Sequence, residues 1–158
     1  MKMTCPICGT GQAKQIKKAY RTMYDGQPVS LPKVEMFRCA ECQEEFFNPE
    51  QAQAVSVEVK NTVRRLSGLL PPERILAIRE KVHLTQSELE RLFGQGPKVV
   101  TRWESGRVIQ SKTADTILRM LEKDPDIILS LLKKVEKNRG QAQRKQAQSE
   151  APEMAAAR

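Results

Sequence analysis

The stretch that decides the fold covers residues 84–106 and reads LTQSELERLFGQGPKVVTRWESG. It opens with the pattern of a capping box, in which the Thr85 hydroxyl accepts a hydrogen bond from the Glu88 N–H and the Glu88 carboxylate reaches back. Apolar residues then recur at helical spacing until Gly94. A second short helix is predicted over 97–104, because proline suits the first position of a helix. Two short helices joined by a glycine-containing turn predict a helix-turn-helix motif.

Three further helical patterns surround this motif. One precedes it over 73–82, and a second follows over 113–122. Asp124-Pro125 provides an N-cap and a first-turn proline for the last pattern. The apolar residues of that last helix are Ile127, Ile128, Leu131, Leu132 and Val135. Residues 73–135 are therefore predicted to form an all-α domain of five helices.

The second helix of the motif presents one polar face, because its polar residues recur at the 3.6-residue period. These candidate DNA-binding residues are Lys98, Thr101, Arg102 and Ser105. The cations suit guanine or phosphate, and the hydroxyls suit phosphate or either base. Gln86 and Ser87, at the positive end of the preceding helix, are predicted phosphate contacts. The alternative is an ordinary solvated, charged helix face with no ligand.

Four cysteines form two C-x-x-C pairs near the N-terminus. They are Cys5, Cys8, Cys39 and Cys42. Two such knuckles supply four thiolates, which matches a closed, tetrahedral and structural zinc site with one Zn²⁺ per chain. Iron–sulfur ligation remains chemically possible. A redox C-x-x-C is the third option, although it would require one active pair in a βαβ setting.

The cysteine pairs are separated by a hairpin signal, with two extended runs on either side of Asp25-Gly26. Residues 1–50 are therefore predicted to form a small α+β zinc-binding domain whose folding depends on its metal. Residues 51–72 are expected to form a connecting helix and hinge, and a helix packed on either domain is the alternative. The composition of 136–158 predicts a disordered tail.

The chain of 158 residues carries 27 Lys and Arg against 19 Asp and Glu, which gives a formal net charge of +8. A basic balance favours a polyanionic partner. No apolar run is long enough to cross a bilayer and no signal peptide is evident, so a cytoplasmic protein is expected. The one histidine, His83, has no nucleophile or carboxylate arrangement around it. An enzyme is therefore not expected.

Two motifs together resemble a known family. Residues 84–94 (LTQSELERLFG) and 99–106 (VVTRWESG) resemble the XRE-type helix-turn-helix, and a CPxCG motif followed by a second CxxC resembles the N-terminal part of MqsA-type antitoxins. The order and spacing of these motifs on one chain carry the resemblance, which covers about residues 3–132.

The resemblance implies a type II antitoxin in two parts. The zinc domain would bind and neutralise a ribonuclease toxin, and the C-terminal domain would dimerise and repress its own operon at a palindromic operator. Family members read bases with an Asn near the start of the recognition helix and an Arg four residues later. Here the Arg is Arg102, whereas Lys98 replaces the Asn and is suited to guanine or phosphate. A zinc-containing regulator without a toxin shares all these residues and remains the rival hypothesis.

Overall fold

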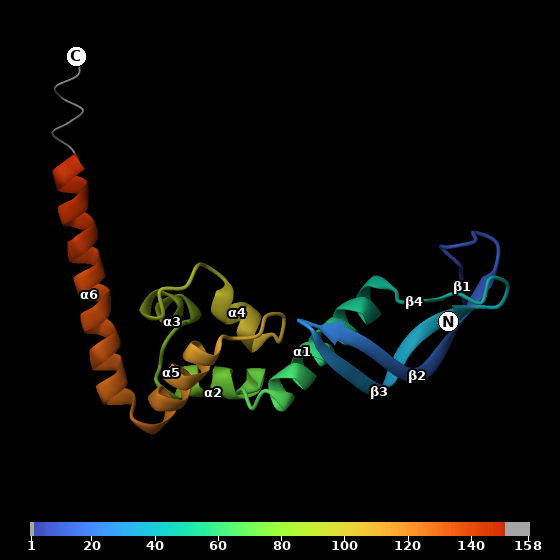
Figure 1. Ribbon diagram of the computed structural model, residues 1–158, viewed down its shortest axis with the longest axis horizontal. Helices are drawn as coiled ribbons and strands as arrows, with labels where there is room; N and C mark the ends of the chain where they lie inside the picture. The colour runs from blue at the N-terminus through green and yellow to red at the C-terminus, as the bar shows by residue number, and fades with distance from the viewer. Residues whose placement is uncertain (1, 151–158) are drawn as a thin grey trace, which may run out of the picture. The chain divides into compact units, whose positions relative to one another are not determined.

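The computed structural model describes residues 2–150, which divide between Pro71 and Pro72 into two compact units. The first unit contains an antiparallel sheet and one helix, and the second contains five helices (Figure 1). The predicted fold class, a small α+β unit followed by an all-α helix-turn-helix unit, is confirmed.

The first unit is built on one long hairpin. Asp25 and Gly26 at its turn both have positive φ, 47° and 74°, which is the conformation of the tight hairpin turn that matches strand twist. The register pairs Tyr24 with Gln27 and continues to Ala13 opposite Cys39, with an irregularity between Lys18 and Tyr20. The sheet order is β1-β2-β3-β4. Its strands are β1 (Lys2–Thr4), β2 (Gln12–Tyr24), β3 (Gln27–Cys39) and β4 (Glu45–Phe46).

One helix, α1 (Pro49–Leu66), packs on this sheet against β2 and β3. Asn48 caps it in a reciprocal capping box with Gln51. Buried apolar residues of β3 and α1 form the core between them: Val29, Leu31, Val34, Met36 and Val59. Helix α1 is therefore packed on the first unit, which was the alternative to a connecting helix for residues 51–72. The apolar stripe of α1 covers the sheet because a two-stranded hairpin cannot bury its own apolar face.

The second unit contains the predicted five helices. They are α2 (Pro72–Lys81), α3 (Gln86–Leu92), α4 (Val99–Glu104), α5 (Lys112–Lys123) and α6 (Pro125–Glu150). Thr85 and Glu88 form the predicted capping box on α3, and Ser111 caps α5. The core of the unit is made of apolar side chains from all five helices: Ile75, Ile78, Leu89, Val100, Trp103, Leu118, Leu121 and Ile128.

Two boundaries in the helical unit differ from the prediction by more than one residue. Helix α4 begins at Val99 rather than at Pro97, because Lys98 adopts a left-handed conformation with φ 63° and interrupts the helical turn. Residues 136–150, predicted to be disordered, continue α6. That stretch is rich in Gln, Ala, Lys and Arg, which are good helix formers. The same residues that suggested disorder can therefore extend a helix that has already started at Pro125. The rest of the predicted tail, 151–158, lies outside the described residues.

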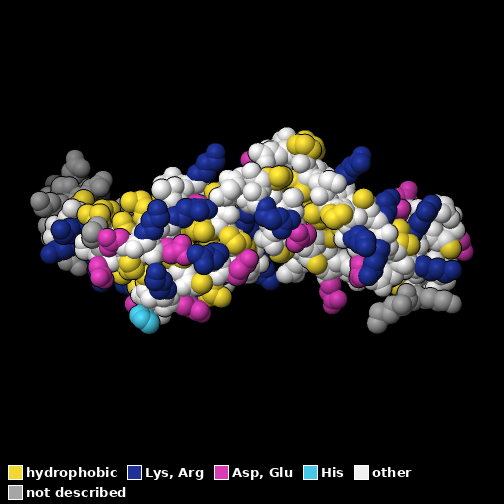
Figure 2. All heavy atoms as spheres, turned by 90° about the horizontal axis from the view of Figure 1, so that it is seen from below, with side chains coloured by type: hydrophobic (Ala, Val, Ile, Leu, Met, Phe, Trp, Pro, Cys, Tyr) yellow, Lys and Arg dark blue, Asp and Glu magenta, His cyan; other side chains and the backbone are white. Residues whose placement is uncertain are grey.

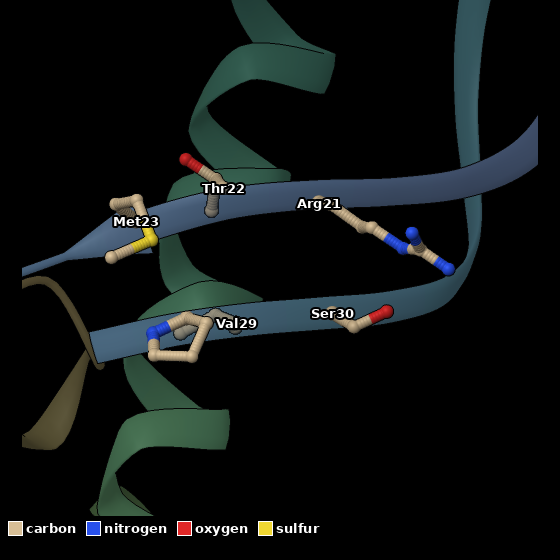
Figure 3. Close-up of a pocket in the computed structure, with 6 residues that line it drawn as sticks. Arg21, Thr22, Met23, Val29 and Ser30 are labelled. Atoms are coloured by element: carbon tan, nitrogen blue, oxygen red, sulfur yellow. The ribbon is translucent and has the colours of Figure 1, made fainter.

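Figure 2 shows Lys and Arg side chains interspersed with Asp and Glu on the face it displays. The positive surplus is therefore not gathered into one basic patch on that face. Near the hairpin turn, Arg21 and Ser30 lie opposite one another on β2 and β3 beside a hollow that also involves Met23 and Val29 (Figure 3). Within residues 2–150, no helix combines the length and apolar character needed to cross a membrane.

Candidate metal centre and nucleic-acid interface

The four cysteines meet at the open end of the hairpin, away from its turn. Cys5 follows β1, Cys8 precedes β2, Cys39 ends β3 and Cys42 precedes β4, so strand pairing brings both knuckles together. Their four sulfur atoms all lie within 4.8 Å of one another. Two pairs, Cys5 with Cys42 and Cys8 with Cys39, have sulfurs 3.8 Å apart.

These distances fit zinc. A regular tetrahedron with Zn–S bonds of about 2.3 Å has sulfur–sulfur edges of about 3.8 Å. Backbone N–H groups of Ile7, Gly11 and Glu41 each donate to a cysteine sulfur at 3.4 Å, as expected where thiolates carry negative charge. The four thiolates fill every position of a tetrahedral ion, so the cluster suits one structural zinc ion and leaves no position for an activated water.

The thiols differ in acidity. Backbone hydrogen bonds from Thr10 and then Gly11 lower the pKa of Cys8 to about 6. At Cys42 the Glu44 backbone hydrogen bond also lowers the pKa, but burial and the hydrogen bonds shared with the other thiols outweigh it and raise the pKa to about 12. A bound Zn²⁺ requires all four as thiolates, so metal binding releases protons from this cluster.

The helix-turn-helix places the predicted polar residues on the outside of α4. Lys98, Thr101, Arg102 and Ser105 are all exposed. On the opposite side, Val100 and Trp103 are 0% and 3% exposed, and the Trp103 ring lies 6.3 Å from that of Phe93. The apolar side of α4 is therefore buried against the rest of the helical unit, while its polar side faces solvent.

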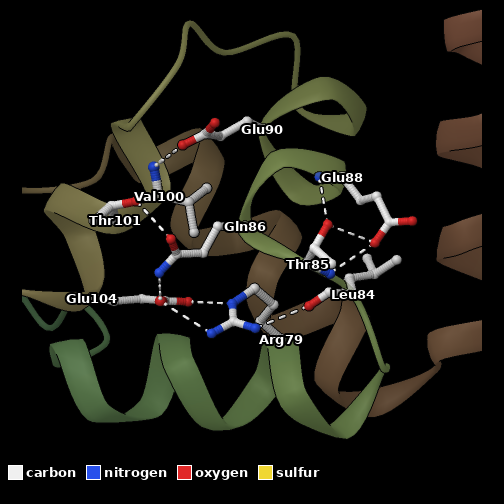
Figure 4. Close-up of polar contacts among 9 residues, drawn as sticks. All are labelled: Arg79, Leu84, Thr85, Gln86, Glu88, Glu90, Val100, Thr101 and Glu104. Carbon is white, nitrogen blue, oxygen red and sulfur yellow. Dashed lines mark hydrogen bonds and ion pairs between the residues drawn. The ribbon is translucent and has the colours of Figure 1, made fainter.

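A polar network fixes α4 against its neighbours (Figure 4). The Arg79 guanidinium donates to both carboxylate oxygens of Glu104, at 2.6 and 3.2 Å. The Gln86 amide donates to Glu104 at 2.6 Å and accepts from the Thr101 hydroxyl at 2.7 Å. The side chains of Arg79 and Glu104 are only 14% and 7% exposed, and the Glu104 carboxylate raises the pKa of Arg79. This network ties α2, α3 and α4 together through charge-assisted hydrogen bonds.

The sequence did not reveal that network. Arg79 and Glu104 are ordinary helix residues by periodicity, and their pairing depends on how α2 and α4 cross. Gln86, predicted as a phosphate contact, has its amide engaged with Glu104 and Thr101. Ser87 is exposed at the start of α3, as expected for a group that could meet a ligand.

Comparison with known proteins identifies the family of this chain. The family model described as the antitoxin component of a bacterial toxin-antitoxin system, MqsA, matches residues 3–133. The chain belongs to the MqsA antitoxin family. Antitoxin MqsA of Escherichia coli is 28% identical over 127 residues, which cover 80% of this chain and 97% of the relative. Antitoxin HigA-2 of Vibrio cholerae is 25% identical over 59 residues, which cover 37% of this chain and 57% of the relative.

Among solved structures, the N-terminal domain of the Escherichia coli protein MqsA matches 42% of this chain and 98% of its own, with 24% identity and a TM-score of 0.33. Membership of the MqsA family makes the chain the antitoxin component of a bacterial toxin-antitoxin system.

Proposed function

We propose that this antitoxin is a dimeric repressor that reads a palindromic operator of its own operon through α4, and that its zinc-bearing unit neutralises a ribonuclease toxin. The observation that carries the DNA-binding part is the two-sided character of α4. Val100 and Trp103 are buried, whereas Lys98, Thr101, Arg102 and Ser105 are all exposed. A short helix anchored in this way can enter a major groove without disturbing the core.

The exposed side chains on and beside α4 would make different contacts with DNA, according to their chemistry. Arg102 has the planar fork that pairs with O6 and N7 of guanine, whereas Lys98 is a point donor for guanine or phosphate. The Thr101 hydroxyl already donates to Gln86, so its remaining capacity is to accept a hydrogen bond, for instance from an adenine or cytosine amino group. Ser105 retains a hydroxyl at the C-terminal end of the same face. Ser87, exposed beside this face, would serve as a phosphate contact, whereas the side-chain amide of Gln86 is already engaged with Glu104 and Thr101.

A dimer is supported by an apolar stripe on α6. Leu131 and Val135 are 50% and 55% exposed and lie one helical turn apart. A second copy of the chain would cover this stripe in a two-fold arrangement. Two recognition helices would then meet half-sites about one helical turn of DNA apart, roughly 34 Å.

The decisive experiment is a gel-shift titration of the full chain with a duplex taken from upstream of its own coding sequence, against a scrambled duplex of the same composition. We expect the Arg102→Ala variant to bind the upstream duplex more weakly by about 1–3 kcal/mol, the value of one good base contact. The matched control is Arg65→Ala, which removes the same charge from an exposed position on α1. Unchanged affinity in folded Arg102→Ala, or an equal loss in Arg65→Ala, would count against base reading by α4.

The toxin-neutralising part is supported by the family assignment and by the presence of the four-cysteine cluster in a compact unit distinct from the helical one. It is tested by expressing the product of the neighbouring gene alone and together with this chain. We expect the neighbouring gene product alone to cause growth arrest and RNA cleavage. The wild-type chain should relieve both effects, whereas a Cys5→Ser/Cys39→Ser variant should not. Full relief by that variant would place neutralisation outside the zinc-bearing unit.

A further inference from the structure

Helix α4 begins without a cap of its own. Its N-cap residue, Lys98, adopts a left-handed conformation and makes no side-chain hydrogen bond to the first turn. An N-cap side chain would normally accept from the second or third N–H of the helix. A helix of six residues cannot compensate by propagation, since isolated helices of this length are unstable in water.

The missing acceptor comes from another helix. The Glu90 carboxylate, on α3, accepts a hydrogen bond from the Val100 N–H at 3.0 Å (Figure 4). Val100 is the second residue of α4, so Glu90 occupies the place of an N-cap oxygen ten residues earlier in the chain. Glu90 is only 6% exposed, an unusual position for a carboxylate unless it is needed for such a contact.

The carboxylate suits this position better than a neutral cap would. A negative charge is favourable at a helix N-terminus, where the unpaired N–H groups and the helix dipole present positive charge. Because Glu90 belongs to α3, its bond also fixes the distance between the two helices of the motif. At the other end of α4, Glu104 is held by Arg79 and Gln86. Carboxylates therefore anchor both ends of α4.

We propose that Glu90 is a positioning residue for sequence recognition, which caps α4 from α3 and holds it in the orientation that discriminates between base sequences. The proposal rests on the DNA-reading function proposed above for α4. Glu90 itself would touch no DNA, because its carboxylate is buried against the first turn of α4. Without its cap, α4 would be ordered in a smaller fraction of molecules, and apparent affinity for the specific site would fall by that fraction.

Two conservative variants of the full chain separate the cap from the charge. Glu90→Gln keeps a carbonyl acceptor at the same reach, whereas Glu90→Asp keeps the charge but withdraws the oxygens by one methylene. Two quantities are measured: the affinity ratio between the upstream and scrambled duplexes, and hydrogen exchange at the Val100 amide. We expect Glu90→Asp to lower the ratio by roughly 5- to 30-fold, the effect of losing a cap on a helix equilibrium, and to expose the Val100 amide. Glu90→Gln should lower the ratio less, by roughly two- to fivefold, because it keeps the acceptor but loses the charge, and it should leave the Val100 amide protected.

The matched control is Glu122→Asp. Glu122 lies on α5 and pairs with Arg74 on α2, so its shortening loosens an interhelical contact without touching α4. A general loss of stability would lower protection throughout the unit in both aspartate variants, but only Glu90→Asp should change the duplex ratio and the Val100 amide selectively.

The outcomes are distinct. If the wild type does not distinguish the duplexes, the proposed DNA function fails, while the Val100 amide still tests the cap. A Glu90→Asp variant with the wild-type ratio, or with undiminished protection at Val100, overturns the inference. If Glu90→Asp does not fold, Glu90→Gln decides, because folded Glu90→Gln with lost discrimination or an exposed Val100 amide contradicts a role as hydrogen-bond acceptor.

Discussion

Gly11 occupies a position where any side chain would enter the metal centre. A Cβ there would lie 2.4 Å from the Cys39 sulfur, 3.1 Å from the Glu41 Cβ and 3.2 Å from the Cys8 sulfur. Favourable non-bonded contacts between heavy atoms need about 3.5–4.0 Å, so in Gly11→Ala the Cys39 sulfur must retreat by about 1 Å. The backbone of Gly11 is not in the left-handed region, so the expected effect is steric rather than conformational.

The size of that effect follows from zinc geometry. Ligand distances in a zinc site hold to within about 0.2 Å, so a shift of about 1 Å in one sulfur cannot be absorbed without lengthening a Zn–S bond or moving a knuckle. Overpacking of a tight site costs about 1–3 kcal/mol, which corresponds to roughly 5- to 150-fold weaker binding. Because the clash falls directly on a ligand atom, we expect the upper half of this range for Gly11→Ala.

The assay is a competition titration in which the protein and a chromogenic chelator share a limiting amount of zinc. Gly96→Ala is the matched control, since a Cβ at Gly96 meets nothing within 4 Å. Thermal unfolding followed by circular dichroism should show a weakened sheet unit and an unchanged helical unit. Zinc affinity of Gly11→Ala within about twofold of both the control and wild type would refute the reasoning, because the 2.4 Å contact would then be relieved at no cost to the ligands.

Three further outcomes are expected. Leu131→Glu should weaken dimerisation by roughly 100-fold or more, because each copy loses an apolar contact of about 1.5–3 kcal/mol, as measured by light scattering across a dilution series. Glu104→Gln should destabilise the helical unit by about 2–4 kcal/mol in denaturant unfolding, because Arg79 is left with an unpaired, largely buried charge. Glu88→Gln should make the free energy of unfolding of the helical unit depend less on pH in the acid range. The Thr85 backbone N–H and then its hydroxyl lower the pKa of Glu88 below its ordinary 4.5, so the stabilisation is present above that pH and is lost as pH falls through the lowered pKa.

Each of these predictions has a distinct point of failure. Gln141→Glu places the same charge on another side of α6, and an equal loss of dimerisation in both variants would mean that the Leu131–Val135 stripe has no special role. For Glu104→Gln, the comparison is Glu35→Gln, which breaks an exposed pair with Lys17 and should have a much smaller effect. An acid profile of Glu88→Gln that superimposes on wild type would mean that the Thr85 hydrogen bonds contribute no pH-dependent stability.

The features that followed from local chemistry were predictable from the sequence. The Asp25-Gly26 turn needs positive φ at both positions, which few other residue pairs provide so readily, and it set the register of the whole hairpin. Two C-x-x-C knuckles on either side of that hairpin then had to meet. The Thr85 capping box fixed the start of α3, which in turn fixed the place of the turn before α4. In each case a few adjacent residues determine the backbone.

The features that the sequence concealed depend on packing between elements. The position of α1 on the sheet required knowing that the hairpin leaves an apolar face uncovered. The pairing of Arg79 with Glu104 joins residues 25 positions apart in the sequence. Helical periodicity placed Lys98 on the polar face of α4, and it is exposed, but periodicity gave no sign of its left-handed backbone. Contacts between residues far apart in the sequence leave no local sequence pattern, so a single sequence does not reveal them.

The left-handed backbone of Lys98 and the remote cap from Glu90 make sense together. A Ser or Asp at position 98 in the usual extended conformation would cap α4, but its side chain would turn back onto the first turn of the helix. Lys98 instead accepts a conformational cost of about 1–2 kcal/mol. The hydrogen bond from Val100 to the Glu90 carboxylate contributes about 1.5–3 kcal/mol and offsets that cost. Capping is thus moved onto α3, and the N-terminal end of α4 keeps an exposed cation where, in the proposed DNA-binding role, the helix would enter the groove.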